Sequence, residues 1–224
     1  MEEVSRAYDR WSATYDGQSN ATRDLDEAVL RSVVPDLSGL AVIECGCGTG
    51  KNSAWLAALC TILVGLDFSA GMLALARAKV RAPNVLFLLS DVREPWPVQP
   101  SGADVVLFNL VLEHVEDLGP VFRHAGNSLR RGGRLVLSEY HPARVAEGKG
   151  PVMVTADGSS VRIPNFLHTR DDYLEAASGA GLVPLSVGEW WSHEEDRGGT
   201  GGRDPAPRPQ LISAVFEKTS SRAG

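Results

Sequence analysis

Residues 40–50 read LAVIECGCGTG, an apolar run followed by three glycines at alternate positions. The first six residues show no alternation of polar and apolar side chains, which is typical of a strand buried on both faces. The glycines Gly46, Gly48 and Gly50 come next and precede a helical pattern. Closely spaced glycines between a strand and a helix let the backbone approach a ligand and present free N–H groups. This stretch therefore predicts an α/β fold with a ligand at the turn.

The residues up to 140 continue the same pattern. Short β-rich runs alternate with helical segments, which indicates a parallel sheet covered by helices on both faces. We expect strands at Leu40–Cys45, Ile62–Asp67, Val85–Leu89, Asp104–Asn109 and Arg134–Glu139. We expect helices at Ser5–Gln18, Arg23–Val34, Asn52–Leu59, Ser69–Val80 with Ser69 as N-cap, and Leu118–Arg131, the last ended by Gly132-Gly133.

After residue 140 the pattern becomes irregular. Residues 141–168 contain two short β-type runs around the turn-like segment 156–159, which favours an inserted hairpin. We then expect a helix at Thr169–Gly179, strands at Val183–Trp190 and Leu211–Lys218, and a mobile loop over the Gly/Pro/Arg-rich stretch 197–209.

These elements predict a doubly wound, mostly parallel seven-stranded sheet within a single domain spanning residues 1–224. Its parts are an N-terminal helical cap (1–39), the ligand-binding core (40–140), the inserted hairpin (141–168) and the C-terminal part of the sheet (169–224).

Composition and charge narrow the class of protein. The chain has 43% hydrophobic and 22% charged residues, as in ordinary globular proteins. Its formal net charge of −6 disfavours a nucleic-acid partner. No apolar run is long enough to span a membrane, and the acidic start at residues 1–3 is unlike a signal peptide, so we expect a cytoplasmic protein. The spacing of Cys45 and Cys47 does not fit a disulfide framework or a zinc site, so we expect no metal.

Acids at two further strand ends add to the glycine loop. Asp67 ends the second expected strand and Asp91 follows the third, and ligands of open parallel sheets bind outside the carboxyl ends of the strands. Asp67 suits ribose hydroxyls, although an acid there can also cap the next helix. A solvated turn acid is the alternative for Asp91. A dehydrogenase that binds NAD is a competing hypothesis, but the dinucleotide fingerprint has two residues before its third glycine, where this loop has one.

Together these motifs resemble the class I methyltransferases that depend on S-adenosylmethionine (SAM), particularly the small-molecule group typified by enzymes of ubiquinone and menaquinone biosynthesis. The resemblance runs from about Tyr8 to Tyr140 and includes the final strand, but it weakens across the inserted hairpin. It implies a Rossmann-like methyltransferase fold. It also implies an enzyme of secondary metabolism that transfers a methyl group from its cofactor SAM to an O, N or C atom of a small molecule.

The resemblance also assigns cofactor-binding residues. Glu44, Gly46, Cys47, Gly48 and Gly50 are expected to bind the amino-acid part of SAM, and Asp67 its ribose. Phe68 and Met72 are expected to flank the faces of adenine, and Asp91 and Val92 to contact its edge. Asn109 is expected to face the methionine moiety, and Tyr15 to contact the SAM carboxylate. For Tyr15 the alternative is an amphipathic helix that buries aromatic residues at helical spacing.

Catalysis by such an enzyme requires mainly that the acceptor atom is held in line with the methyl group and that water is excluded. Where the acceptor must lose a proton, the candidate bases are His141, His114 and Glu139. A structural, hydrogen-bonding histidine is the alternative for His114. The expected contacts of a partly apolar acceptor are Phe166, His168 and Tyr173.

Two other functions use the same motifs. A SAM-binding enzyme of this fold could catalyse a reaction without methyl transfer, such as a cyclisation, and a non-catalytic module could bind SAM alone.

Overall fold

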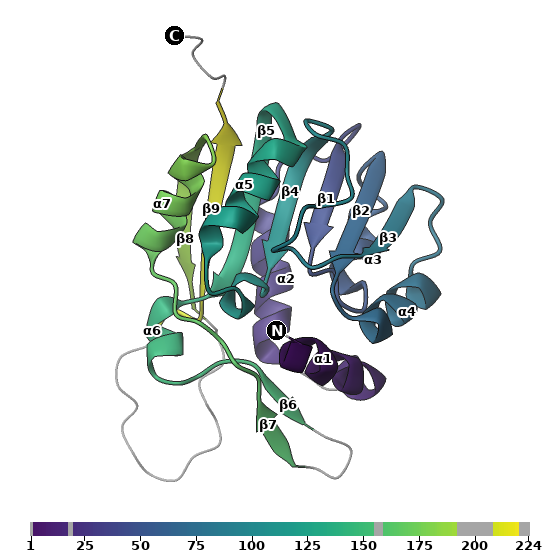
Figure 1. The fold of residues 1–224 in the computed structure, drawn as a ribbon, viewed down its shortest axis with the longest axis vertical. Helices are drawn as coiled ribbons and strands as arrows, with labels where there is room; N and C mark the ends of the chain where they lie inside the picture. The colour runs from purple at the N-terminus through teal and green to yellow at the C-terminus, as the bar shows by residue number, and fades with distance from the viewer. Residues whose placement is uncertain (1, 18–19, 155–158, 192–207, 220–224) are drawn as a thin grey trace.

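The computed structural model describes residues 2–17, 20–154, 159–191 and 208–219 (Figure 1). Its main feature is a seven-stranded sheet of order β3-β2-β1-β4-β5-β9-β8. The strands are β1 Ala41–Cys45, β2 Ile62–Asp67, β3 Val85–Leu89, β4 Ala103–Asn109, β5 Leu129–Tyr140, β8 Leu182–Trp190 and β9 Leu211–Lys218. Strands β1 to β5 pair in parallel, whereas β9 is antiparallel to both β5 and β8. The predicted doubly wound, mostly parallel sheet is confirmed.

Helices cover both faces of the sheet (Figure 1). They are α1 Glu2–Tyr15, α2 Ala21–Val33, α3 Lys51–Leu56, α4 Ala70–Lys79, α5 Leu118–Ser128, α6 Pro142–Ala146 and α7 Arg170–Gly179, with a 3₁₀ turn η1 at Leu112–His114. Helices α5 and α7 pack on one face over a core that includes Phe108, Phe122 and Phe216. Helices α2, α3 and α4 cover the other face, where Leu30, Leu56 and Leu73 are buried.

A cover lies across the carboxyl edge of the sheet, at the bottom of Figure 1. It consists of α1 and the predicted hairpin, whose strands β6 (Val152–Val154) and β7 (Ser160–Arg162) pair antiparallel. Val4 and Trp11 of α1 are buried against Met153 and Ile163 of the hairpin segment and Met72 of α4. Apolar burial therefore joins the two ends of the cover, which are distant in sequence.

The predicted end of α5 was wrong. The helix ends at Ser128 and β5 begins at once, at Leu129, which pairs with Ala103. Gly132 and Gly133 do not stop a helix but lie in an irregular part of β5, where the register shifts. A Cβ atom on Gly133 would lie 3.1 Å from the backbone oxygen of Asp104, so glycine is needed for this close approach of two backbones.

Smaller differences concern the helices. Helix α1 spans Glu2–Tyr15 rather than Ser5–Gln18, and α2 spans Ala21–Val33 rather than Arg23–Val34. Helix α3 ends at Leu56 rather than at residue 59. Helix α6 was not predicted, although Pro142 at its first position is an ordinary start signal; its N-cap is His141, which is not a usual capping residue. Residues 156–158 of the expected turn and 197–207 of the expected loop lie outside the described residues.

Candidate functional site

The three glycines of the loop adopt left-handed backbone conformations, with φ of 67° at Gly46, 53° at Gly48 and 77° at Gly50. Their surroundings differ. A Cβ on Gly46 would overlap the Cγ2 atom of Val111, and a Cβ on Gly50 would lie 3.2 Å from that of Ala76. A Cβ on Gly48 would meet no atom within 4 Å among the described residues. Gly46 and Gly50 are thus required by packing, whereas Gly48 faces open space in front of the sheet edge.

Asp67 connects the end of β2 to this loop. Its Oδ2 accepts a hydrogen bond of 2.8 Å from the backbone N–H of Gly48, and its Oδ1 accepts one of 2.8 Å from Ser69 N–H. Burial raises the pKa of Asp67 to about 6, although the two backbone N–H groups oppose the rise. The side-chain cap of α4 is Ser69, whose Oγ accepts from Met72 N–H. Asp67 therefore fixes the conformation of the loop at the predicted ribose position.

Glu44 and Cys47 lie behind the loop. Glu44 is 2% exposed, and its carboxyl accepts a hydrogen bond from the Ser53 hydroxyl. Burial raises the pKa of Glu44 to about 8. Cys47 packs into the core beneath α3 and α4, and burial raises the pKa of its thiol well above the usual value. Cys47 is thus a neutral, packed side chain, and the part of the chain described by the structure contains no group of three or more His, Cys, Asp or Glu residues arranged for a metal ion.

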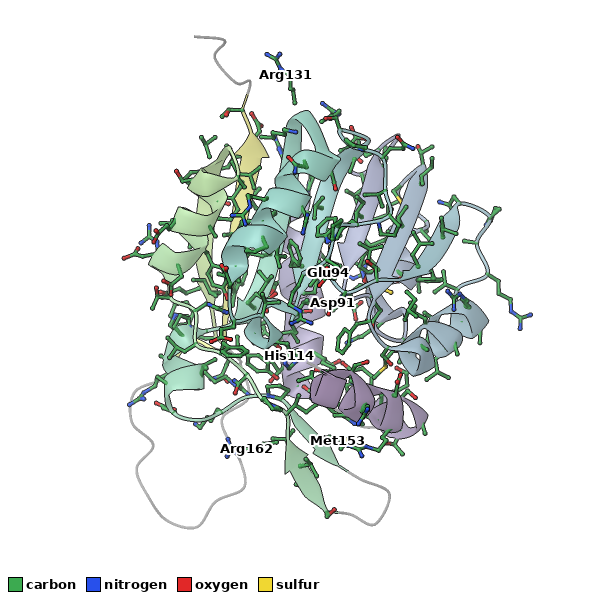
Figure 2. The ribbon with its side chains drawn as sticks, viewed as in Figure 1. Asp91, Glu94, His114, Arg131, Met153 and Arg162 are labelled. Atoms are coloured by element: carbon green, nitrogen blue, oxygen red, sulfur yellow. The ribbon has the colours of Figure 1, made fainter. Side chains whose placement is uncertain are left out.

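The residues predicted to surround adenine lie beyond β2 and β3. Asp91 forms a bidentate ion pair with Arg93, and although burial raises the pKa of Asp91, the bonds from Arg93 outweigh that effect and lower it. Figure 2 shows Asp91 at the carboxyl edge of the sheet. Val92 and Met72 are buried, and Phe68 packs beside Met72 against α1. Asp91 is therefore a half-buried acid that is paired with Arg93.

A group of buried polar atoms lies at the ends of β4 and β5. Asn109 is 9% exposed, and neither of its amide atoms has a hydrogen-bond partner within the described residues. The Ser138 hydroxyl and Oδ1 of Asp26 on α2 are also buried and unpartnered there. Burial raises the pKa of Asp26 to about 7, and the nearby Ser138 and Asn109 side chains oppose this rise. Buried polar groups without partners are destabilising by about 1–3 kcal/mol each, so this arrangement suits a polar ligand.

His114 joins the cover to the sheet edge (Figure 2). Its Nδ1 lies 3.0 Å from the carbonyl oxygen of Pro164, and its Nε2 lies 2.9 Å from the hydroxyl of Tyr8. Since a carbonyl can only accept, Nδ1 carries the proton when the ring is neutral and Nε2 accepts from Tyr8. Both ring nitrogens of this candidate base are therefore engaged.

Glu139, the second candidate base, is fully buried at the end of β5. Its two carboxyl oxygens accept hydrogen bonds of 3.1 to 3.2 Å from the backbone N–H groups of Val111 and Leu112. Burial, followed by the charge of the neighbouring Glu113 carboxyl, raises the pKa of Glu139 well above its usual value. Glu139 thereby holds the turn after β4 in place.

His141, the third candidate base, caps α6 at the end of β5. Its Nδ1 accepts a hydrogen bond of 3.2 Å from Ala143 N–H, which leaves Nε2 as the N–H donor of the neutral ring. That atom lies 3.4 Å from a carboxyl oxygen of Glu189. His141 is half-buried and makes weaker contacts than His114.

The three predicted substrate residues do not form one group at the sheet edge. Tyr173 is buried in the core beneath α5 and α7. The ring of His168 lies tilted against that of Tyr173, and its Nε2 donates a hydrogen bond of 2.7 Å to the carbonyl of Val115. Phe166 is 36% exposed, and its backbone N–H donates to the carbonyl of Glu113.

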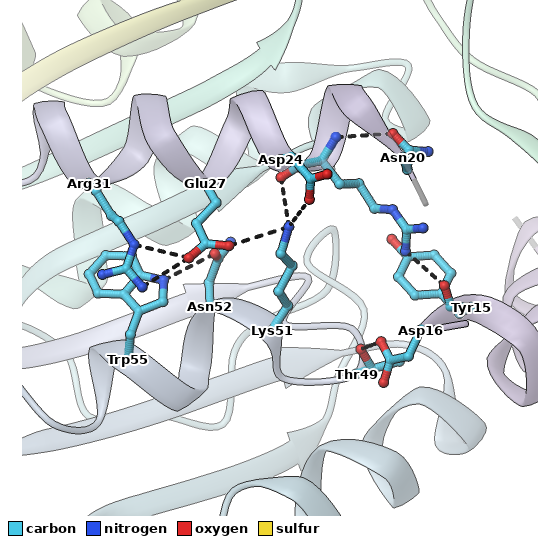
Figure 3. Close-up of polar contacts among 11 residues, drawn as sticks. Tyr15, Asp16, Asn20, Asp24, Glu27, Arg31, Thr49, Lys51, Asn52 and Trp55 are labelled. Carbon is cyan, nitrogen blue, oxygen red and sulfur yellow. Dashed lines mark hydrogen bonds and ion pairs between the residues drawn. The ribbon is translucent and has the colours of Figure 1, made fainter. Parts of the chain in front are cut away.

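Tyr15 lies at the end of α1, where polar contacts bind the N-terminal helices to the glycine loop (Figure 3). The guanidinium of Arg23 lies 4.1 Å from the centre of the Tyr15 ring. Asp16 accepts a hydrogen bond of 2.6 Å from the Thr49 hydroxyl and pairs with Lys79 at 2.7 Å. Each exposed pair contributes about 0–1 kcal/mol, but together these contacts set the position of α1 over the loop.

Asp26, Glu113 and Ser138 were not predicted from the sequence as residues of this region. Asp26 had a detectable signal, because it lies three and four residues before the buried Val29 and Leu30 and so shares their face of α2. No sequence pattern of this kind indicates Glu113 or Ser138.

Residues 43–137, from β1 to β5, match the family model described as a methyltransferase domain. This chain carries a SAM-dependent methyltransferase domain. It is 28% identical to an uncharacterized methyltransferase of Emericella nidulans, over 84% of this chain and 79% of that protein. It is 29% identical to a malonyl-[acyl-carrier protein] O-methyltransferase of Xylella fastidiosa, over 64% of this chain and 50% of the relative, so the match covers half the length of that protein.

Solved structures have the same fold as this methyltransferase domain. A SAM-dependent methyltransferase of Mesorhizobium loti superposes with a TM-score of 0.70 and 22% identity, covering 88% of this chain and 99% of the other. A geranyl diphosphate C-methyltransferase of Streptomyces coelicolor, solved with S-adenosyl-L-homocysteine, superposes with a TM-score of 0.65 and 17% identity, covering 88% and 80%. In the described residues no helix is both long enough and apolar enough to cross a membrane.

Proposed function

We propose that this enzyme methylates a small organic molecule held between the carboxyl edge of the sheet and the cover formed by α1 and the hairpin. The observation that carries the proposal is Asn109, whose buried amide is unpartnered in the described structure beside a loop where Gly48 faces open space. SAM, when bound, supplies a methyl carbon attached to a positively charged sulfur. The chain must bind and orient both reactants and exclude water.

The residues at this edge fit SAM. Polar groups suited to its amino-acid part, an acid suited to its ribose and apolar side chains suited to adenine follow one another along the strand ends. In this proposal the binding residues are Tyr15, Glu44, Gly46, Cys47, Gly48, Gly50, Asp67, Phe68, Met72, Asp91, Val92 and Asn109.

Residues 1–224 would act as one domain, because α1, α4 and the hairpin share a buried cluster. A cytoplasmic location is part of the same proposal. Among the three predicted bases, His141 is the one with the weakest contacts, and it stands where β5 ends. The acidic net charge of −6 favours a small acceptor over a nucleic acid.

Calorimetric titration with SAM, S-adenosylhomocysteine (SAH) and NAD tests the cofactor part of the proposal. We expect the parent to bind SAM and SAH but not NAD. Asp67→Asn should weaken SAM binding about tenfold or more, which corresponds to about 1.4 kcal/mol or more. Asp171→Asn, a change of an exposed acid on α7, is the matched control and should bind as the parent does. Binding of NAD without SAM would refute the proposal.

Transfer is tested separately by incubating the enzyme with SAM and a fractionated metabolite extract. Mass spectrometry should find a small molecule that gains one methyl group while SAH accumulates. Tight SAM binding without any methylated product would instead indicate a non-catalytic binding module.

A further inference from the structure

Glu113 is a buried acid that neither the sequence motifs nor the proposed cofactor contacts use. It lies in the 3₁₀ turn after β4 and is 3% exposed. Its Oε2 is buried and has no hydrogen-bond partner in the described part of the chain. An ionisable oxygen in this state is costly to bury unless a ligand completes its contacts.

A second buried carboxyl stands beside it. Glu139 is held by the backbone N–H groups of Val111 and Leu112, so it cannot move away from Glu113 without breaking these bonds. Two adjacent buried carboxyls do not both ionise, since each charge disfavours the other. Burial, followed by the charge of Glu113, raises the pKa of Glu139 well above its usual value, so Glu139 holds a proton beside Glu113.

The charge of Glu113 acts on groups from several elements beneath the cover. Burial raises the pKa of Tyr8 and Tyr15 on α1 and of Tyr140 at the end of β5, and the charge of Glu113 adds to each rise. It acts in the same direction on Asp26 of α2. Glu113 is therefore surrounded by residues of the same buried region that contains the unpartnered amide of Asn109.

We propose that Glu113 is the proton acceptor of the methyl-transfer reaction and that Glu139, beside it, is a positioning residue. This inference rests on the proposed function. It also defines the substrate class, namely an acceptor whose reacting atom carries a proton, such as an amine, a hydroxyl or a carbon acid. The acceptor atom forms a bond to the methyl carbon, its proton passes to a carboxyl oxygen of Glu113, and the electron pair of the broken carbon–sulfur bond stays on sulfur.

The surrounding charges disfavour a carboxylate acceptor. Buried residues in the described structure include the acids Asp26, Glu44, Asp67, Glu113 and Glu139 but no Lys or Arg. An anionic acceptor would be repelled by any of these groups that ionise, whereas a neutral or cationic one would not.

Cofactor charge gives the carboxyl pair a testable property. A positive sulfonium close to the pair favours the ionised form of Glu139, so binding of SAM should release the proton of Glu139. SAH contains a neutral sulfur and should not do so. Proton release therefore distinguishes the two cofactor forms without any acceptor being known.

The experiment is calorimetric titration of SAM and of SAH near neutral pH in phosphate and in Tris, whose ionisation enthalpies differ. The difference between buffers counts released protons. We expect SAM to release about 0.5 to 1 proton more than SAH in the parent. Glu113→Gln and Glu139→Gln should each abolish this excess while still binding SAM. Glu116→Gln, a change of an exposed acid three residues along the chain, should retain it.

One further variant separates the pair from its surroundings. The titratable groups that face Glu113 are Tyr8 and Tyr15 on α1, Asp26 on α2, His114 on the same turn, Glu139 and Tyr140 on β5, and Tyr173 on α7. Of these, Asp26 has a pKa close to neutral. Asp26→Asn should retain the excess release if the pair is its source, and loss of the excess in this variant alone would overturn the assignment to Glu113.

The titration also distinguishes failure of the proposed function from failure of this inference. Absence of SAM binding refutes the proposed function and this inference together, whereas SAM binding with equal proton counts for SAM and SAH refutes only the inference. With the acceptor found in the extract, Glu113→Gln should lower kcat by about 10²–10⁴-fold, leave the KM for SAM nearly unchanged and remove the acidic limb of the pH profile. A methyl ester as the product would overturn the assigned substrate class.

Discussion

Replacement of Glu44 by glutamine should change how the stability of this protein depends on pH. Glu44 is 2% exposed, and its burial raises the pKa from 4.5 to about 8. Because the folded state binds this proton more tightly than the unfolded state, the contribution of Glu44 to stability is fully present below about pH 4.5. It is lost as the pH rises and levels off above the folded pKa of about 8.

The size of the effect follows from the same two values. One pKa unit corresponds to about 1.36 kcal/mol, so between about pH 5 and about pH 8 the buried carboxyl lowers the free energy of unfolding by roughly 3 kcal/mol. Glutamine has nearly the same shape and can still accept the hydrogen bond from Ser53, but it does not ionise. The variant should therefore gain about 3 kcal/mol relative to the parent over this pH range.

Urea denaturation followed by circular dichroism measures this difference at each pH. The exposed control Glu116→Gln should show a much smaller change relative to the parent, because an exposed carboxyl has no burial penalty. If the difference between Glu44→Gln and the parent were the same at both pH values, the argument from burial would be wrong.

Three further substitutions separate the roles of the loop and the cover. Gly46→Ala should lower the free energy of unfolding by about 2–4 kcal/mol, because its Cβ overlaps Val111, and Val111→Ala in the same chain should restore part of that loss in urea denaturation. Gly48→Ala should lower the free energy of unfolding by only about 1 kcal/mol. It should weaken SAM binding at least tenfold in calorimetry, because its Cβ enters the open space in front of the loop. Unchanged affinity for SAM would contradict the proposed cofactor position. Tyr8→Phe removes the hydrogen bond to His114 and should lower the free energy of unfolding by about 0.5–1.5 kcal/mol. It should also speed amide hydrogen exchange in α1. Unaltered exchange would show that α1 does not depend on this contact.

The parts of this fold that were predictable from sequence are those with local signals. The bounds of β2, β3 and β9 were predicted to the residue, because apolar runs without alternation are bounded there by polar and turn residues. The end of α5 was not predictable in the same way. The pair Gly132-Gly133 indicates an unusual backbone, but only the pairing of Leu129 with Ala103 makes it a strand irregularity instead of a helix stop.

In the candidate site, too, only residues with a local sequence signal were predictable. Asp67 and Asn109 were found because parallel strands place their carboxyl ends at one edge, so position along the strand is enough to group them. The carboxyl pair was not found, because Glu113 and Glu139 are far apart in sequence and only the folded turn after β4 brings them together. The contacts of Phe166, His168 and Tyr173 with a substrate stay a prediction. Tyr173 is buried in the core whereas Phe166 is exposed, and the sequence alone does not predict this difference.

The place of β9 in the sheet, between β5 and the edge strand β8, has a consequence for synthesis of the protein. β9 fills the position between β5 and β8 and pairs with both, yet it begins about 70 residues after β5 ends. At roughly 5–20 residues per second, the ribosome needs about 4 to 14 s to add the intervening chain. During this time the hydrogen-bonding edge of β5, which is destined for the core, has no partner. An unpaired edge of this kind is a template for aggregation. A nascent chain of this enzyme therefore depends on rapid synthesis of β8 and β9, so that β9 pairs with β5, or on a chaperone that covers β5.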